Sequence, residues 1–231
     1  MLFKSAVLTQ ASGSIGGLTA SHNRGGMYFR SRAIPTNPSS ARQVAIRSAM
    51  STLSSAWAGL TQLQRDAWTL YGQNVPVTNR LGDSVILTGQ QQYLRSNVPR
   101  YQAGLARVDA GPTEFTLPTL DQMGLTSVDV AGLVTVTFVD TQDWLDETGA
   151  ALLIYAGRPQ GVGINFFKGP YRYGTAIEGD ATTAPTTPGT FTSDFACALG
   201  QKVWIYSRLS RLDGRLSVEQ SLGPIVVEAA P

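Results

Sequence analysis

The chain has 231 residues, a formal net charge of +2 and a charged fraction of 15%, well below the roughly 25% of an average soluble protein. One histidine and one cysteine exclude a zinc site, a Cys–His enzyme and a disulfide-stapled secreted module. The sequence carries no motif that reports a reaction, so we expect neither enzymatic activity nor a cofactor.

Residues 1–38 are predicted to form an extended arm with little core of its own. Residues 2–10 alternate loosely, as in a strand, and residues 12–17 are rich in Gly and Ser and flexible by composition. Pro35 and Pro38 forbid a helix at the end of the arm and favour extended backbone.

A turn followed by a strand-like segment lies within the arm. Residues 22–26 have turn composition, which predicts that His22 belongs to a turn. Residues 27–32 alternate aromatic and basic side chains at a period of two. Two strands around this Gly-rich turn would form a β-hairpin.

Residues 39–100 are predicted to form a helical module. Apolar side chains recur at three- and four-residue spacing over a first helix, residues 40–58, which ends near Gly59. Thr61 and Gln64 match a capping box for a second helix that runs to about Gln73. The short connection between the first and the second helix predicts a tight helical hairpin.

A third, short helix is predicted to begin at Thr88 and to end at Pro99. Trp57 and Trp68 are interpreted as core side chains in preference to a ligand platform. The helical hairpin could also be mistaken for a DNA-reading helix-turn-helix, but its second helix exposes few side chains of the kind that contact bases.

Beyond a linker at residues 101–118, the pattern changes to the period of two that is typical of strands. Residues 119–231 are predicted to form a β-sandwich of immunoglobulin or fibronectin type III style, which makes the fold class α+β. The expected strands and hairpin signal are residues 133–139, 151–155, 189–192, 202–208, 211–217 with its Asp-Gly turn, and 224–228.

A long aromatic and Gly-rich loop is predicted between Gly157 and Ala184. Long ordered loops on such domains are often functional. We interpret the loop as an interface and keep, as an alternative, a cover for the edge of the sandwich. The candidate interface side chains are Phe166, Phe167, Tyr171 and Tyr173.

Other chemistry-bearing residues have plain structural interpretations. Cys197 lies in an apolar stretch and is expected to be a buried core thiol. The acidic cluster of Asp140, Asp143, Asp146 and Glu147 could bind calcium, but its spacing does not match a calcium loop and a solvated turn is preferred. No apolar run is long enough to predict a membrane span.

The two halves of the chain carry opposite charge. Residues 1–110 contain eleven basic and three acidic residues (+8), whereas residues 111–231 contain seven basic and thirteen acidic residues (−6), and the first acid is Asp66. Such asymmetry suggests an interaction role. Nearly all the basic residues are dispersed arginines, which favours contact with protein over contact with nucleic acid. An incidental solvated face is the remaining alternative.

Several segments resemble the uncharacterised structural proteins that tailed bacteriophages and prophages encode. The resemblance rests on residues 16–30, on Leu60-Thr61 with residues 64–68, and on residues 89–97, 165–171 and 213–217. It covers most of the chain and implies a virion component, assembled in the host cytoplasm. No functional residues transfer from the group.

The expected function is therefore that of a capsid decoration or cement protein. An Arg-bearing arm would lace onto the major capsid protein, in repeated copies or as a homo-oligomer, with no membrane and no nucleic acid as partner. The alternatives are a tail, connector or fibre-base component, and a carbohydrate-binding module for host attachment that uses the aromatic loop. The candidate partner-binding residues are Arg24, Tyr28, Phe29, Arg30, Arg32, Arg42 and Arg47.

Overall fold

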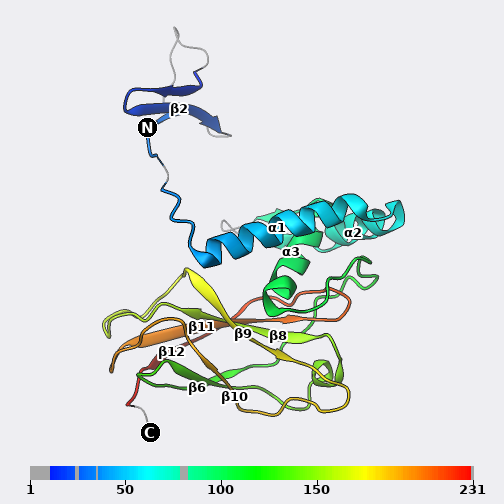
Figure 1. Ribbon diagram of the computed structural model, residues 1–231, viewed down its shortest axis with the longest axis vertical. Helices are drawn as coiled ribbons and strands as arrows, with labels where there is room; N and C mark the ends of the chain where they lie inside the picture. The colour runs from blue at the N-terminus through cyan, green and yellow to red at the C-terminus, as the bar shows by residue number, and fades with distance from the viewer. Residues whose placement is uncertain (1–10, 24–25, 35, 79–82, 230–231) are drawn as a thin grey trace. The chain divides into compact units, whose positions relative to one another are not determined.

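Helices and antiparallel sheets alternate along the chain in the computed structural model, which describes residues 11–23, 26–34, 36–78 and 83–229 (Figure 1). The predicted α+β class is confirmed. The chain divides into one unit that ends at Ala41 and a second that begins at Arg42. The domain boundaries expected at residues 38, 100 and 118 stay predictions.

The first unit contains a three-stranded antiparallel sheet of order β1-β2-β3. Its strands are β1 (Gly13–Ile15), β2 (Leu18–Asn23) and β3 (Gly26–Ser31). Strand β3 agrees with the strand expected at residues 27–32, and it pairs with β2, which was not predicted. Two expectations are corrected. Residues 12–17 include strand β1, and Gly16, with a left-handed φ of 57°, forms the tight turn between β1 and β2. His22 lies on β2, opposite Met27, and not in a turn. The alternation at residues 2–10 lies outside the described residues.

The helical module follows the expected pattern closely. Its helices are α1 (Ala41–Gly59), α2 (Gln62–Asn74) and α3 (Gly89–Ala103), and a two-stranded ribbon of β4 (Val77–Thr78) and β5 (Ser84–Val85) precedes α3. Both α2 and α3 begin with a capping box, at Thr61 and Thr88. Trp57 and Trp68 belong to the core of the module, as predicted, and their rings both contact Tyr93.

The prediction that Pro99 ends the third helix is wrong, because α3 continues through it to Ala103. Pro99 removes one backbone donor, but Gly104 caps the helix in the left-handed conformation and its N–H donates to the carbonyls of Arg100 and Tyr101. The Arg100 side chain is fully buried and anchors the last turn of α3 to residues outside the helix. Tertiary contacts therefore outweigh the local cost of the proline.

Two antiparallel sheets make up the remainder of the second unit. One has the order β10-β7-β6 and the other the order β12-β11-β8-β9. The strands are β6 (Gly124–Val128), β7 (Leu133–Thr137), β8 (Ala151–Gly157), β9 (Tyr171–Glu178), β10 (Gly189–Thr192), β11 (Lys202–Ser210) and β12 (Gln220–Val226), and a short 3-10 helix, η1 (Asp143–Asp146), connects β7 to β8.

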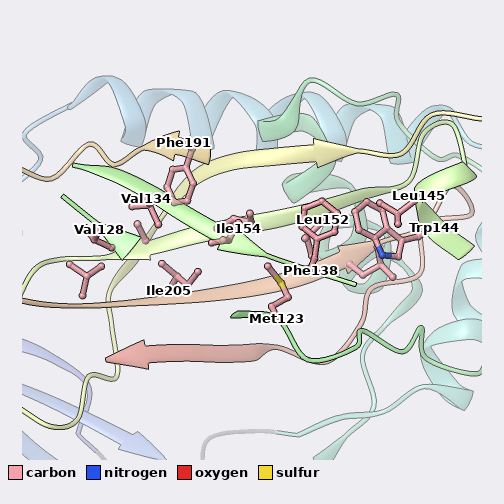
Figure 2. Close-up of a cluster of buried hydrophobic side chains, with 14 of the residues drawn as sticks. Met123, Val128, Val134, Phe138, Trp144, Leu145, Leu152, Ile154, Phe191 and Ile205 are labelled. Carbon is pink, nitrogen blue, oxygen red and sulfur yellow. The ribbon is translucent and has the colours of Figure 1, made fainter. Parts of the chain in front are cut away.

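The inner faces of the two sheets enclose one apolar core, which we call the two-sheet core. Figure 2 shows Val134 and Phe191 from one sheet beside Ile154 and Ile205 from the other. Trp144 of η1 closes one end of this core and is fully buried. Alternating apolar residues on each strand supply the inward side chains, as expected for sheets that face each other.

Strand β8 is buried on both faces, so its sequence is apolar without alternation. Leu152 and Ile154 face the two-sheet core, whereas Leu153 and Tyr155 belong to a second cluster on the outer face, together with Leu105 at the end of the helical module. The helices thus lie over the outer face of the four-stranded sheet (Figure 1). The helical module and the sheets share buried surface.

The strand predictions were mostly confirmed, with two omissions. Strand β6 was not predicted, and the loop expected between Gly157 and Ala184 contains β9. Arg172, Gly174 and Glu178 interrupt the apolar alternation of β9, which lies at the edge of its sheet and is only partly buried along most of its length. The Asp213-Gly214 turn is confirmed: Gly214 has a φ of 89°, and Ser210 pairs with Leu216 across it.

The segment expected to be a linker is packed against the helices. The Trp68 indole Nε1 donates a 3.0 Å hydrogen bond to the Asp109 carbonyl, and Asn97 and Val108 exchange hydrogen bonds of 2.8 and 3.0 Å. Pro112 and Pro118 are buried. Residues 104–118 therefore join the helical module to the sheets as ordered structure.

Candidate partner-binding surfaces

The sheet of the first unit has one apolar face and one polar face. Opposed residues of an antiparallel pair share a face, and the register places Ile15 opposite Leu18 and Ala20 opposite Phe29. The mainly apolar face, which we call the apolar face, carries Ile15, Leu18, Ala20, Met27 and Phe29, together with His22 opposite Met27 and Ser31 opposite Leu18. Ile15 is 89% exposed and Leu18 is 55% exposed, and no side chain described in this sheet is buried. Ile15 and Leu18 therefore remain largely exposed on this face.

The polar face carries hydroxyl groups and positive charge. It consists of Ser14, Thr19, Ser21, Tyr28 and Arg30. The Ser14 and Thr19 hydroxyl groups lie 2.8 Å apart and form a cross-strand hydrogen bond. Arg32 follows β3, and its N–H donates a 2.8 Å hydrogen bond to the Gly17 carbonyl. Because no acid precedes Asp66, the arginines of this unit have no acidic neighbour in the same unit.

The residues predicted to bind a partner fall into two groups. Tyr28, Phe29 and Arg30 lie on β3, on alternating faces of the sheet, and Arg24 lies outside the described residues. Arg42 and Arg47 lie on α1. The structure gives Arg42 a partner inside its own unit, because its guanidinium pairs with Asp194 and donates a 3.3 Å hydrogen bond to the Tyr173 carbonyl.

Three of the four predicted interface aromatics form a chain of ring contacts on the outer face of the four-stranded sheet. Phe167 stacks on Trp204 with ring centroids 5.8 Å apart, and Tyr171 meets Phe167 edge-on at 5.1 Å. Tyr173 packs edge-on against Tyr155, which stacks on Tyr206 at 4.4 Å. Burial raises the pKa of Tyr206 to about 12 and also raises that of Tyr171 and Tyr173. These rings contribute to packing within the unit.

Phe166 differs from its neighbours, because it is 75% exposed. Val162 and Ile164 in the same β8–β9 connection are also exposed, at 68% and 45%. The connection is held in place: Gln160 and Lys202 exchange two backbone hydrogen bonds of 2.8 and 2.9 Å, and the Lys202 ammonium donates to the Asn165 side chain at 2.6 Å. A constrained loop that exposes large apolar side chains is typical of a contact surface.

The acidic cluster after β7 interacts with an arginine. Asp143 accepts a 2.8 Å hydrogen bond from Arg211, and Glu147 pairs with the same guanidinium and also accepts from the Leu212 N–H at 2.8 Å. Within the described ranges, no group of three or more His, Cys, Asp or Glu residues is arranged to hold a metal ion. The cluster thus ties the β7–β8 connection to the turn after β11.

Cys197 is half-buried and packs against the two-sheet core, so the expected core thiol is only partly enclosed. Burial, followed by the negative charge of Asp129, raises the pKa of this thiol. A raised pKa leaves less thiolate at neutral pH, which disfavours a nucleophilic role.

No protein-family model, no curated protein and no solved structure matches this chain. In the part of the chain that the structure describes, no helix combines the length and the apolar character that crossing a membrane requires. The candidate surfaces therefore rest on their own geometry: an amphipathic sheet in the first unit, and a constrained apolar loop in the second.

Proposed function

We propose that the protein is a structural component of a tailed-bacteriophage particle, most simply a capsid decoration protein. The observation that carries the proposal is the amphipathic sheet of residues 13–31. A small sheet of this kind is marginally stable alone and needs its apolar face buried against another surface. Ile15 and Leu18 are the side chains that such a surface would cover.

The partner that fits this sheet is an acidic protein surface, as the major capsid protein would offer. Arg30 and Arg32 are exposed, and no acid neutralises them within the first unit. Guanidinium groups form forked hydrogen bonds to carboxylates, and arginine is enriched at protein interfaces. A surface that combines carboxylates with an apolar strip would therefore complement both properties of the sheet.

We further propose that the two sheets of the second unit form a sandwich of fibronectin type III style. Numbered one to seven in chain order, the strands β6 to β12 are arranged as 1-2-5 and 4-3-6-7. The immunoglobulin constant arrangement is 1-2-5-4 and 3-6-7. The two differ only in the fourth strand, here β9, which pairs with β8 in place of β10. Such domains commonly serve as interaction modules at surfaces.

The test is the copy number of the protein in purified particles, measured by quantitative mass spectrometry against the major capsid protein. Hundreds of copies per particle would support a decoration protein spread over the shell. About six or twelve copies would instead assign it to the connector or tail, and absence from particles would overturn the proposal. A glycan-array measurement on the same protein covers the carbohydrate-binding alternative.

A further inference from the structure

An open polar cavity of about 350 Å³ lies at one end of the two-sheet core. Its lining comes from two connections, the residues after β8 and those between β10 and β11, and from the start of strand β9. The lining residues are Arg158, Pro159, Arg172, Asp194, Phe195, Ala196 and Gln201. None of the residues singled out in the sequence as partner-binding lines this cavity.

The charges in the lining do not balance. Arg158 and Arg172 contribute two positive charges against the single carboxylate of Asp194. That carboxylate is already paired with Arg42, which reaches it from the first turn of α1. Among the described residues, Arg158 and Arg172 have no carboxylate within ion-pairing distance. Burial and the nearby charge of Arg172 lower the pKa of Arg42, which agrees with an excess of positive charge here.

The cavity also holds one of its arginines in place. The Arg172 guanidinium carbon lies 4.4 Å from the centre of the Phe195 ring, a cation–π contact that restrains the side chain. The Arg172 backbone is fixed in β9 opposite Ala156 of β8. Pro159 and Ala196 add apolar lining. The restrained guanidinium can form two parallel hydrogen bonds to an anion, and the apolar lining beside it can contact an aliphatic stem that carries the anion.

We propose that this cavity binds a carboxylate carried on a short aliphatic stem, such as the side chain of a glutamate. Because Arg42 already neutralises Asp194, Arg158 and Arg172 are left to pair with an added anion. The apolar lining of Pro159 and Ala196 favours a carboxylate with an aliphatic stem over inorganic phosphate, which has no apolar part. The site is independent of the particle assignment, because it depends only on residues of the second unit.

The full-length protein, labelled with ¹⁵N-arginine, tests the site by NMR. Propionate is titrated while the side-chain Nε–H resonances are followed, and neutral propionamide of the same shape serves as the matched control ligand. The expected result is a saturable shift of the Arg158 and Arg172 resonances with propionate alone. Equal shifts with propionamide, or no saturable shift with propionate, would overturn the proposal, as would tighter binding of inorganic phosphate.

Two variants and one peptide complete the experiment. We expect Arg172→Gln to weaken propionate binding by roughly fivefold or more, whereas Arg107→Gln, which alters an arginine paired with Asp109 outside the cavity, leaves it unchanged. Equal affinities in the two variants would contradict the site. The peptide acetyl-Ala-Glu-Ala-amide distinguishes the sources: tighter binding than propionate assigns a protein side chain, and equal binding assigns a free acid, both within the proposed carboxylate chemistry.

Discussion

The two β regions of this protein both alternate apolar and polar residues, but they differ in whether the apolar side chains are buried. In the two-sheet core, the inward residues of each sheet are covered by the other sheet, and Val134 and Ile154 are fully buried. In the sheet of the first unit, Ile15 and Leu18 are exposed on the mainly apolar face. The comparison teaches that alternation specifies which face is to be buried but does not supply the surface that buries it.

The largest effect that this comparison predicts is the loss of particle incorporation on deletion of residues 1–38. The deletion removes both faces of this sheet, with Arg30 and Arg32, but leaves the cores of the second unit complete. Mass spectrometry of particles should detect no truncated protein, whereas its thermal unfolding should remain cooperative. Incorporation of the truncated protein at the full level would show that the first unit is not the binding element.

Replacement of Arg100 tests how firmly the helical module is joined to the sheets. Arg100 is fully buried and donates to the Ala106 carbonyl, the Ser210 hydroxyl and the Arg211 carbonyl at 2.9, 3.1 and 2.8 Å. Arg100→Met leaves these buried acceptors without a donor, and we expect it to lower the free energy of unfolding by about 3 kcal/mol. Urea denaturation measures this change.

The matched control is Arg107→Met, which breaks the exposed pair with Asp109 and should cost about 0.5 kcal/mol. If the two variants were equally stable, the buried arginine would not hold the helices to the sheets. The second unit would then be less firmly packed than the comparison with the first unit assumes.

Neighbouring residues of β2 allow the two faces of the first unit to be compared directly. Leu18→Thr makes the apolar face more polar, whereas Thr19→Val keeps the side-chain shape and removes a hydroxyl group from the opposite face. Both substitutions keep residues that favour strands. We expect Leu18→Thr to weaken binding to particles by roughly tenfold, because about 1–2 kcal/mol of apolar burial is lost.

The Thr19→Val variant should bind as the unaltered protein does, in a sedimentation assay with purified particles. The reverse result, with Thr19→Val weakened and Leu18→Thr unaffected, would mean that the polar face makes the contact.

The last prediction concerns alkaline pH and applies to the second unit. Burial raises the pKa of Tyr71 and Tyr93 to about 12 in the folded protein, against about 10 in the unfolded chain. The unfolded state therefore loses these protons first, and stability falls as pH rises from 10 to 12. The slope should be about 1 kcal/mol per pH unit for each tyrosine.

Urea denaturation at pH 9, 10 and 11 measures this slope. Tyr93→Phe should make it shallower, because one of the buried titrating tyrosines is removed. An unchanged slope in that variant would show that Tyr93 does not contribute to the pH dependence.

Much of the fold could be predicted because its signals are local. The capping box at Thr61, the apolar spacing of α1 and the Asp213-Gly214 turn each depend on residues within a few positions of one another. The charge asymmetry of the two halves also needs only counting. For the candidate surfaces, the sequence pointed to Tyr28 and Arg30 but could not separate exposed Phe166 from packed Phe167.

The remainder required tertiary structure, because it depends on contacts between residues distant in the chain. Pro99 lies inside α3 because the same turn is anchored by Arg100 to Ser210, more than a hundred positions away. Strand β9 likewise forms by pairing with β8, and the arginine-lined cavity forms where β9 meets the β8–β9 and β10–β11 connections. Periodicity and capping act through neighbours along the backbone and are therefore determined by the sequence alone. Which face is covered, and which arginine is paired, is decided only when distant segments compete for the same buried surface.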